Sequence, residues 1–307
     1  MTCHNCRTEC KKFGKHPGGR QRFQCRSCKK TFTEQGPLDE MRLPLAKAET
    51  ILKMMVEGCS IRTIERLTDV HRDTIMRLLE LAGERCERLL SEKIRGLEVA
   101  DVSADEIWGY CWCKEKNRPT DSPFIGDAYC FVGMENNSKL ILAWHLGRRT
   151  AQHTMEFTEK LRVATTGRFQ ISTDGWPSYK DCIPYSLGKR VDFATIVKVY
   201  RSDREGEARY APPEVASTVR TPIHGKPDMT RVSTSHVERQ NLSIRMGMRR
   251  MTRLTNGFSK KWENLRAAYA LWFAFFNFCR VHKTLRVTPA MESNLTDHVW
   301  TIAELLA

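Results

Sequence analysis

The chain has 307 residues, a composition typical of soluble globular proteins and a formal net charge of +14 that is unevenly distributed. Residues 1–35 hold nine Lys and Arg against two Glu, a net of +7, and residues 231–286 hold twelve against two, a net of +10. The remainder therefore carries about −3. This pattern favours a polyanionic partner, most simply nucleic acid, and no lipidation motif supports an anionic membrane instead.

Several classes of protein are disfavoured by the same composition. The first 22 residues contain no apolar run of the kind that forms a signal peptide. The most apolar segment, Ala267–Cys279, has 13 residues and is too short for the ~20 that span a bilayer. We expect it to be a buried helix and expect no membrane partner. Twelve cysteines are few for a disulfide scaffold of this length, which indicates a reducing cytoplasm.

Residues 1–36 are predicted to form a zinc ribbon. The pairs Cys3-x-x-Cys6 and Cys25-x-x-Cys28 have the spacing of a tetrahedral four-cysteine site. A unit of this size cannot bury enough apolar surface to fold without the metal. Four protein ligands leave no open position, so the Zn²⁺ is expected to be structural, with Cys10 as a substitute ligand of poorer spacing.

Residues 41–95 are predicted to form a helix-turn-helix domain followed by a linker helix. After a helix over residues 46–56, Ile61–Leu67 and Arg72–Ala82 follow a helical pattern with a short break between them. The second helix of such a motif reads the DNA major groove from its first residues. The candidate DNA-binding side chains are therefore His71, Arg72, Asp73, Thr74 and Arg77. A plain helical hairpin is the alternative.

From residue 97 the helical pattern gives way to strand-like runs, and residues 97–290 are predicted to form an α/β domain. Residues 97–113, 128–134 and 139–145 read as strands, residues 150–163 as a helix, residues 169–174 as a short strand, and residues 190–200 as another strand-like run. Residues 202–231 contain four prolines and little apolar pattern, so we expect an irregular insertion there. Helices are expected from Ser235 and over residues 260–282, and residues 291–307 form a C-terminal tail. The order predicts an antiparallel-then-parallel sheet.

Three carboxylates occupy positions from which they can converge. Asp105 lies on the first strand, Asp174 ends a later strand, and Glu238 lies in the first turn of the helix that begins at Ser235. Carboxylate oxygens are the ligands that Mg²⁺ prefers, and two such ions can clamp the attacking and leaving oxygens of a phosphodiester. Each residue also has a simpler role, as a cap or a turn former, and Glu106 or Asp101 is an alternative first ligand.

The helix that carries Glu238 is predicted to be amphipathic. A serine followed three residues later by a glutamate is a helix-start signature. Its apolar positions are Val237, Ile244, Met248 and Met251, whereas arginines follow Glu238 on another face. These arginines have almost no balancing acids near them, which favours contact with DNA phosphates. The candidate DNA-binding residues are Arg239, Arg245, Arg249, Arg250 and Arg253, and His236 is a weaker candidate.

With these motifs, the sequence resembles the transposases of the IS1 family of bacterial insertion sequences, which belong with DDE transposases and retroviral-type integrases. The resemblance covers nearly the whole chain. It rests on the two cysteine pairs and on the segments Asp105–Trp108, Thr173–Tyr179, Ser235–Leu242, Arg249–Thr255, Phe258–Lys260 and Asn277–Arg286. It implies a zinc ribbon, a helix-turn-helix and an RNase H-like catalytic core in which Asp105, Asp174 and Glu238 are the three catalytic acids.

The resemblance also implies a reaction and partners. The protein would bind the terminal inverted repeats of its element and, with Mg²⁺ or Mn²⁺, cut there and join the freed ends to target DNA. Two DNA ends must be handled together, so at least a homodimer is expected, associated with the prokaryotic nucleoid. The alternative is a non-catalytic, sequence-specific DNA-binding regulator, for which the N-terminal modules would suffice.

Overall fold

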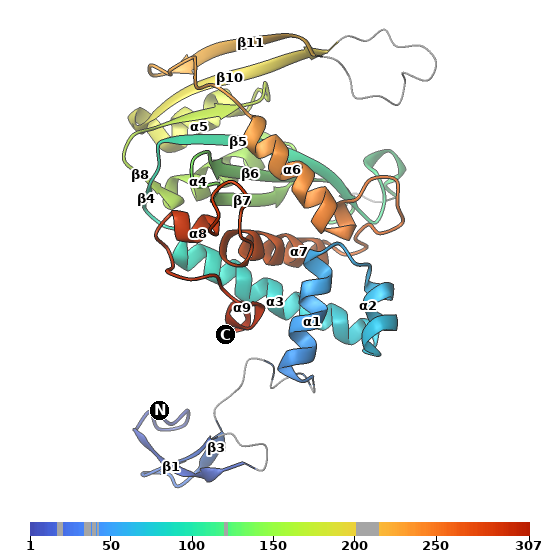
Figure 1. Cartoon of the computed structure of the whole chain (residues 1–307), viewed down its shortest axis with the longest axis vertical. Helices are drawn as coiled ribbons and strands as arrows, with labels where there is room; N and C mark the ends of the chain where they lie inside the picture. The colour runs from blue at the N-terminus through green and yellow to red at the C-terminus, as the bar shows by residue number, and fades with distance from the viewer. Residues whose placement is uncertain (17–20, 34–37, 39–40, 42, 120–121, 201–214) are drawn as a thin grey trace. The chain divides into compact units, whose positions relative to one another are not determined.

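The structure is a computed structural model of the 307-residue chain. It describes all residues except 17–20, 34–37, 39–40, 42, 120–121 and 201–214. The chain divides into two compact units, Met1–Ala48 and Glu49–Ala307 (Figure 1).

The first unit is built on a three-stranded antiparallel sheet with strands in the order β1 (Cys10–Lys15), β2 (Gln21–Cys25) and β3 (Thr31–Thr33). Phe23 and Phe32 pair across β2 and β3, and their rings stack with centroids 6.2 Å apart. These two rings are half-buried and cover the small core, whereas Phe13 is exposed. Gly18 and Gly19, which the sequence favours as a hairpin turn, lie outside the described residues.

The second unit begins with helices. α1 spans Leu45–Val56, with its first four residues still in the first unit, α2 spans Ile61–Thr68 and α3 spans Arg72–Lys93. Ser60 caps α2 by accepting a hydrogen bond from the Thr63 N–H. The two helices expected over residues 72–95 form one continuous helix, because Gly83 does not interrupt the hydrogen bonding. A Cβ on Gly83 would lie only 2.5 Å from the Ala267 Cα atom, so the glycine permits close packing of α3 against α7 (Trp262–Ala274).

A six-stranded mixed sheet forms the centre of this unit, and its strand order is β11-β10-β9-β5-β6-β7. The strands are β5 (Asp101–Cys111), β6 (Gly126–Glu135), β7 (Ile141–Gly147), β9 (Phe169–Thr173), β10 (Val191–Tyr200) and β11 (Val215–His224). β5, β6 and β7 pair antiparallel, whereas β9 pairs parallel with β5 and with β10. The expected antiparallel-then-parallel sheet is confirmed. A short parallel pair joins β4 (Leu97–Glu98) to β8 (Thr165–Thr166).

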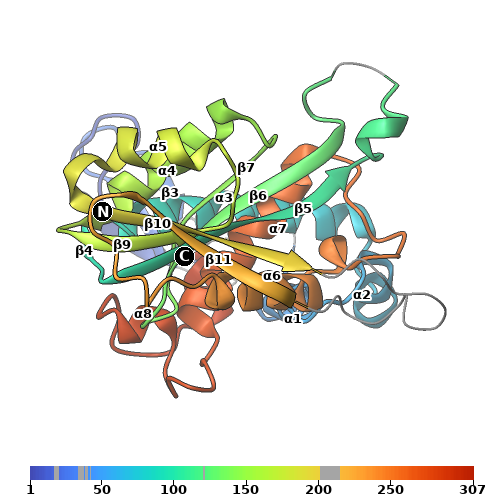
Figure 2. The ribbon, with the colours of Figure 1, turned by 90° about the horizontal axis from the view of Figure 1, so that it is seen from above.

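Helices cover both faces of the sheet (Figures 1 and 2). On one face lie α4 (Ala151–Ala164) and α5 (Tyr179–Leu187), and on the other lie α6 (Ser235–Gly247) and α7. Alternation along the strands supplies apolar side chains to both. Phe131 stacks on Phe157 of α4, with ring centroids 5.8 Å apart, and Trp144 contacts Phe273 of α7 at 5.5 Å.

Two segments differ from expectation. Residues 215–224, expected to be irregular, form the strand β11, whose side chains are mostly exposed. Among the described residues, β10 is its single partner at the sheet edge, so no buried apolar pattern marks it. The long helix expected over residues 260–282 is shorter: α7 ends at Ala274 and passes into a π-helical turn over Phe275–Cys279.

The remaining elements are short. They are the 3-10 turns Glu115–Asn117, Gly188–Arg190 and Arg249–Met251, and the C-terminal helices α8 (Pro289–Glu292) and α9 (Ile302–Leu306). Among the residues that the structure describes, no helix is both long enough and apolar enough to cross a membrane.

Candidate active site

Parallel pairing of β5 with β9 brings Asp105 and Asp174 together. Ala104 pairs with Thr173 in the register of these two strands, so the next residue of each strand, an aspartate, lies at the same level. Glu106 follows directly on β5. One carboxylate oxygen from each of Asp105, Glu106 and Asp174 lies within 4.8 Å of the other two. The sequence-predicted aspartates are therefore neighbours, although the residues between them number almost seventy.

Asp105 and Glu106 are neighbours on β5 and make contacts on opposite faces of the sheet. Asp105 Oδ2 accepts a hydrogen bond from Asn241 Nδ2 of α6 at 2.9 Å. Glu106 Oε2 lies 3.1 Å from Arg149 Nη2, at the start of α4, and the same nitrogen lies 3.3 Å from Asp174 Oδ2. Arg149 thus neutralises part of the charge on two carboxylates, and its guanidinium lies 4.3 Å from the centroid of the Trp176 ring.

Burial and mutual repulsion both act on these carboxylates. Burial, followed by the charge of Asp174, raises the pKa of Asp105 to about 7 and that of Glu106 to about 8. Glu106 Oε1 is buried and makes no hydrogen bond of normal geometry. The hydroxyl of Tyr179 lies beside it and is also buried without a hydrogen bond of normal geometry. A compact set of oxygen ligands with excess negative charge fits a hard divalent cation such as Mg²⁺ or Mn²⁺.

Glu238 lies on α6 but is not among the carboxylates within 4.8 Å of one another. Its side chain accepts hydrogen bonds from Lys198 Nζ and, at 2.7 Å, from Thr234 Oγ1. Burial acts to raise the pKa of Glu238, but these hydrogen bonds lower it below its ordinary value. Glu238 is nevertheless close enough to contribute to the raised pKa of Asp105.

The start of α6 differs in detail from expectation. The N-cap residue is Thr234, not Ser235, and no side chain caps the backbone there. Glu238 instead accepts a hydrogen bond from the Thr234 hydroxyl. The helix-start signature therefore places the helix correctly, although Ser235 and Glu238 do not cap its backbone. The predicted apolar face is confirmed, since Val237, Ile244, Met248 and Met251 are all buried; the helix itself ends at Gly247.

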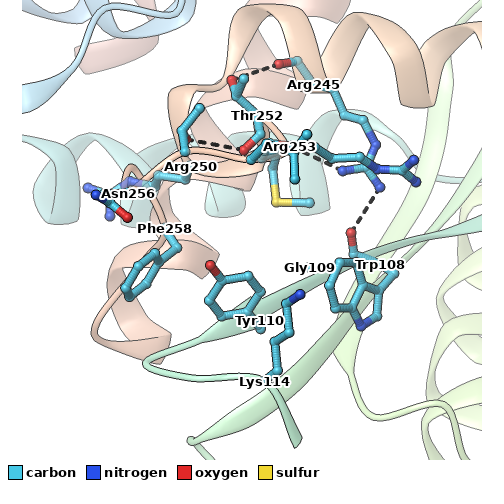
Figure 3. Close-up of a pocket in the computed structure, with 13 residues that line it drawn as sticks. Trp108, Gly109, Tyr110, Lys114, Arg245, Arg250, Thr252, Arg253, Asn256 and Phe258 are labelled. Atoms are coloured by element: carbon cyan, nitrogen blue, oxygen red, sulfur yellow. Dashed lines mark hydrogen bonds between the residues drawn. The ribbon is translucent and has the colours of Figure 1, made fainter. Parts of the chain in front are cut away.

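A basic and aromatic cavity of about 600 Å³ adjoins β5 beyond Asp105 (Figure 3). Its aromatic wall consists of Trp108, Tyr110 and Phe258, and its cationic residues are Lys114, Arg245, Arg250 and Arg253. The ring centroids of Tyr110 and Phe258 lie 5.0 Å apart, and Lys114 Nζ lies 5.9 Å from the centroid of the Trp108 ring. Such a combination suits a nucleic-acid strand, whose phosphates are anionic and whose bases stack on aromatic rings.

The predicted DNA-binding residues fall into two groups. The exposed ones are His71, Arg72, Arg77, Arg239, Arg249 and Arg253, with Thr74 partly buried. Arg245 and Arg250 make internal contacts instead. Arg245 donates to the carbonyl oxygens of Trp108 and Met251, each at 3.0 Å. Arg250 donates to Ser259 Oγ at 2.9 Å and contacts Met76 of α3, and burial lowers its pKa to about 10.

The expected helix-turn-helix core is realised only in part. Residues 69–71 connect α2 to α3, and Asp69 has a left-handed backbone with φ of 54°. The sequence positions with the spacing of such a core are Ile61, Ile64, Leu67, Val70, Ile75, Leu78 and Leu79. Ile64, Val70, Ile75, Leu78 and Leu79 are buried, but Leu67 is 64% exposed. The exposed leucine leaves an apolar side chain on the surface of α2 next to the candidate DNA-reading end of α3.

In the first unit, Cys3, Cys6, Cys25 and Cys28 form a compact four-sulfur cluster. Their Sγ atoms lie 3.3–3.6 Å apart for the pairs Cys3–Cys28, Cys3–Cys6 and Cys6–Cys25. A tetrahedral Zn²⁺ with Zn–S bonds of about 2.3 Å places sulfurs about 3.8 Å apart, so the arrangement fits zinc. Cys10 is not in the cluster; its thiol donates to the Thr8 carbonyl oxygen at 3.5 Å.

Sequence reasoning missed Arg149, Lys198 and Asn241. Arg149 precedes a helix in an unremarkable Arg-Arg pair, Lys198 is one polar residue on a strand, and Asn241 follows Glu238 by three residues. None lies in a spacing that marks it as part of a site. Each becomes notable only because the fold brings it into contact with Glu106, Glu238 or Asp105.

Comparison with known proteins yields only distant likenesses. No family model and no curated protein sequence matches the chain. Among solved structures, the piggyBac transposase synaptic complex with hairpin DNA is similar at 12% identity and a TM-score of 0.41, over 85% of this chain and 68% of that one. The Mos1 transposase paired-end complex and the Mos1 strand transfer complex give 13% and 14% identity and TM-scores of 0.23 and 0.22. Each covers 50% of this chain and, respectively, 58% and 57% of the other. Likeness at this level does not by itself assign a fold or a function.

Proposed function

We propose that the chain is a metal-dependent transposase that cleaves DNA at the ends of an insertion sequence and joins them to target DNA. The observation that carries this proposal is the convergence of Asp105 and Asp174 from adjacent parallel strands, with Glu238 on the helix that packs beside them. The mixed sheet, with three antiparallel strands followed by parallel ones, supports an RNase H-like core. The sequence motifs favour the IS1 family in particular.

Asp105, Asp174 and Glu238 would hold two Mg²⁺ or Mn²⁺ ions. Bound there, the ions would activate water or a 3′-hydroxyl and offset charge on the leaving oxygen, so no side-chain nucleophile is needed. Asn241 orients Asp105. Arg149 holds Glu106 and Asp174 in place, and its positive charge offsets part of the repulsion between these two carboxylates.

Glu106 is the rival for the third carboxylate, because it already lies within 4.8 Å of the two aspartates while Glu238 is paired with Lys198. We favour Glu238 because 41% of its side chain is exposed and can therefore meet a DNA strand, whereas only 2% of the Glu106 side chain is exposed. Rotation of Glu238 away from Lys198 would add its oxygens to the set.

DNA would be held by the basic surfaces at both ends of the chain. We infer that α2 and α3 form a helix-turn-helix that reads the inverted repeat through His71, Arg72, Thr74 and Arg77, together with the zinc ribbon. Arg239, Arg249 and Arg253 are exposed near α6 and would contact phosphates, while Arg245 and Arg250 shape the aromatic cavity from within. Two ends must be joined in one reaction, so the active form would be at least a homodimer.

The decisive experiment compares three glutamine variants with the wild type. Movement of a plasmid-borne element with its native flanks is scored in cells, and purified protein is assayed for Mg²⁺-dependent cleavage of end DNA. Glu238→Gln should lose cleavage by at least about 100-fold with DNA binding unchanged. Glu263→Gln, an exposed residue of α7, should retain both and serves as the matched control.

The outcomes separate the alternatives. Full cleavage by Glu238→Gln with loss in Glu106→Gln would move the third ligand to Glu106. Specific binding to the flanks without cleavage by the wild type would instead indicate a DNA-binding regulator. Cleavage without movement would indicate a metal-dependent nuclease.

A further inference from the structure

A second group of ligating side chains lies outside the carboxylate site, where β7 leads into α4. His145 is on β7, and His153 and Glu156 lie three residues apart on α4. His145 Nε2 is 2.8 Å from His153 Nδ1 and 3.3 Å from Glu156 Oε2, and His153 Nδ1 is 3.8 Å from Glu156 Oε2. These three atoms point at one another from two elements.

The triangle has the dimensions of a metal site. A point equidistant from three atoms with these separations lies about 2.0 Å from each, and Zn²⁺ binds histidine nitrogen and carboxylate oxygen at about 2.0–2.2 Å. An ion just above the plane of the triangle would therefore reach all three ligands without movement of the backbone. Two imidazoles and one carboxylate are a set that suits Zn²⁺ and related transition metals, not Mg²⁺.

The backbone at this corner is adapted to the two imidazole rings. Gly147 ends β7, and a Cβ there would lie 2.4 Å from His153 Cγ and 2.9 Å from His145 Nε2. Any larger residue would displace both rings. Thr150 caps α4 by accepting from the His153 N–H, which fixes the first helical turn. The absence of a side chain at Gly147 is thus what lets the rings meet.

Burial differs among the three ligands in a way that leaves the group accessible. His145 is buried, with 10% of its side chain exposed, whereas 28% of the His153 side chain and 44% of the Glu156 side chain are exposed. Burial, followed by the positive charges of neighbours that include Lys160 and Arg266, lowers the pKa of the His145 imidazole. Arg266 is already paired with Glu87 at 2.6 Å, and Lys160 donates to the Trp144 carbonyl oxygen.

We propose that His145, His153 and Glu156 form a second transition-metal site, binding Zn²⁺ with three protein ligands and a fourth position open to solvent. Neither the proposed transposase reaction nor the four-cysteine site accounts for this group, and its test does not depend on either. The chain would then hold metal ions at three kinds of site: thiolate-bound Zn²⁺ in the first unit, oxygen-bound Mg²⁺ at the carboxylates, and Zn²⁺ at this corner.

Cross-strand pairs connect the proposed metal site to the carboxylates on β5. His145 pairs with Phe131 across β7 and β6, and Phe131 pairs with Glu106 across β6 and β5. The group therefore lies in the same cross-strand row as Glu106, two strands or about 10 Å away. Arg149, which contacts Glu106 and Asp174, lies between His145 and His153 in sequence. A bound ion would fix the turn that presents Arg149.

The test counts zinc in the full-length protein. Wild type, His153→Ala, Glu156→Gln and the control His298→Ala are equilibrated with Zn²⁺ in excess Mg²⁺, freed of unbound metal and measured by atomic emission. His298 is a suitable control because it also lies between two carboxylates, those of Asp297 and Glu304, yet belongs to no three-ligand group within the described part of the chain. The wild type and His298→Ala should hold about one zinc per chain more than the other two variants.

Zinc affinity supplies the second measurement. With the cysteine site already loaded, zinc should raise the melting temperature of the wild type, and loss of a direct ligand should weaken this binding by more than about 100-fold, beyond the 10–100-fold typical of outer-shell changes. Equal zinc counts in the wild type and in Glu156→Gln would overturn the proposal and leave a hydrogen-bonded His–His–Glu network. Displacement of this zinc by Mg²⁺ would overturn it as well. Glu156 is half-exposed, so Glu156→Gln decides the matter if His153→Ala fails to fold.

Discussion

Asp105→Asn should make the magnesium-free protein more stable at alkaline pH, although it removes a proposed catalytic group. Burial and the charge of Asp174 raise the pKa of Asp105 from its ordinary 3.8 to about 7. A group whose pKa is raised by folding contributes stability that is fully present below the unfolded-state pKa and is lost as the pH rises through the folded-state pKa. For Asp105, that loss runs from about pH 4 to about pH 7.

The size of the effect follows from the same values. A pKa of about 7 against 3.8 corresponds to on the order of 4 kcal/mol by pH 8, and to on the order of 2 kcal/mol at pH 5. An asparagine keeps the shape of Asp105 and can still accept from Asn241 Nδ2, but it carries no charge. We therefore expect Asp105→Asn to raise the free energy of unfolding by up to this amount at pH 8 and by less at pH 5.

The assay is urea unfolding of the wild type, Asp105→Asn and the exposed control Asp181→Asn, at pH 5 and pH 8, with and without Mg²⁺. No chelator is used, so the cysteine-bound zinc stays in place. Mg²⁺ should stabilise the wild type and Asp181→Asn at pH 8 but have little effect on Asp105→Asn. The reasoning is refuted if Asp105→Asn is less stable than the wild type at pH 8 without Mg²⁺, or if Mg²⁺ stabilises all three proteins equally.

Three further outcomes are expected. Gly83→Ala should lower the free energy of unfolding by about 1–3 kcal/mol, because its Cβ would overlap Ala267. The control Glu84→Ala, on the exposed side of α3, should change this free energy by less than about 0.5 kcal/mol. Urea unfolding measures both. Cys25→Ser should lose the cysteine-bound zinc and unfold the first unit, yet leave the near-ultraviolet circular dichroism of the second unit unchanged. Arg253→Ala should weaken DNA binding uniformly across sequences and reduce the slope of log affinity against log salt by about 1, as measured by fluorescence anisotropy at several salt concentrations.

Local pattern was enough to predict much of this protein. Two cysteine pairs at fixed spacing predict the four-sulfur cluster, because metal-binding turns are short and their ligands lie within a few residues. The apolar positions of α6 are buried as expected, since helical periodicity alone sets which side chains share a face. Alternating and apolar runs predict β5, β6 and β7, and the order of strands and helices predicts the kind of sheet.

Tertiary structure decides what the sequence leaves open. Asp105 and Asp174 lie close together because of the parallel register of β5 and β9. Arg149 contacts Glu106 because of where α4 starts. The pKa values of these carboxyl groups also depend on tertiary structure, because residues far apart in the sequence supply the burial and the neighbouring charges that raise them.

The meeting of His145 with His153 shows both contributions at one corner of the fold. The sequence supplies two imidazoles, a carboxylate and a glycine within twelve residues, but their spacing matches no familiar metal motif. Only the turn from a strand into a helix brings the three ligating atoms to within 3.8 Å of one another. Spacing along a chain predicts contacts within one helix or one turn, whereas contacts between elements depend on the packing that the whole domain adopts.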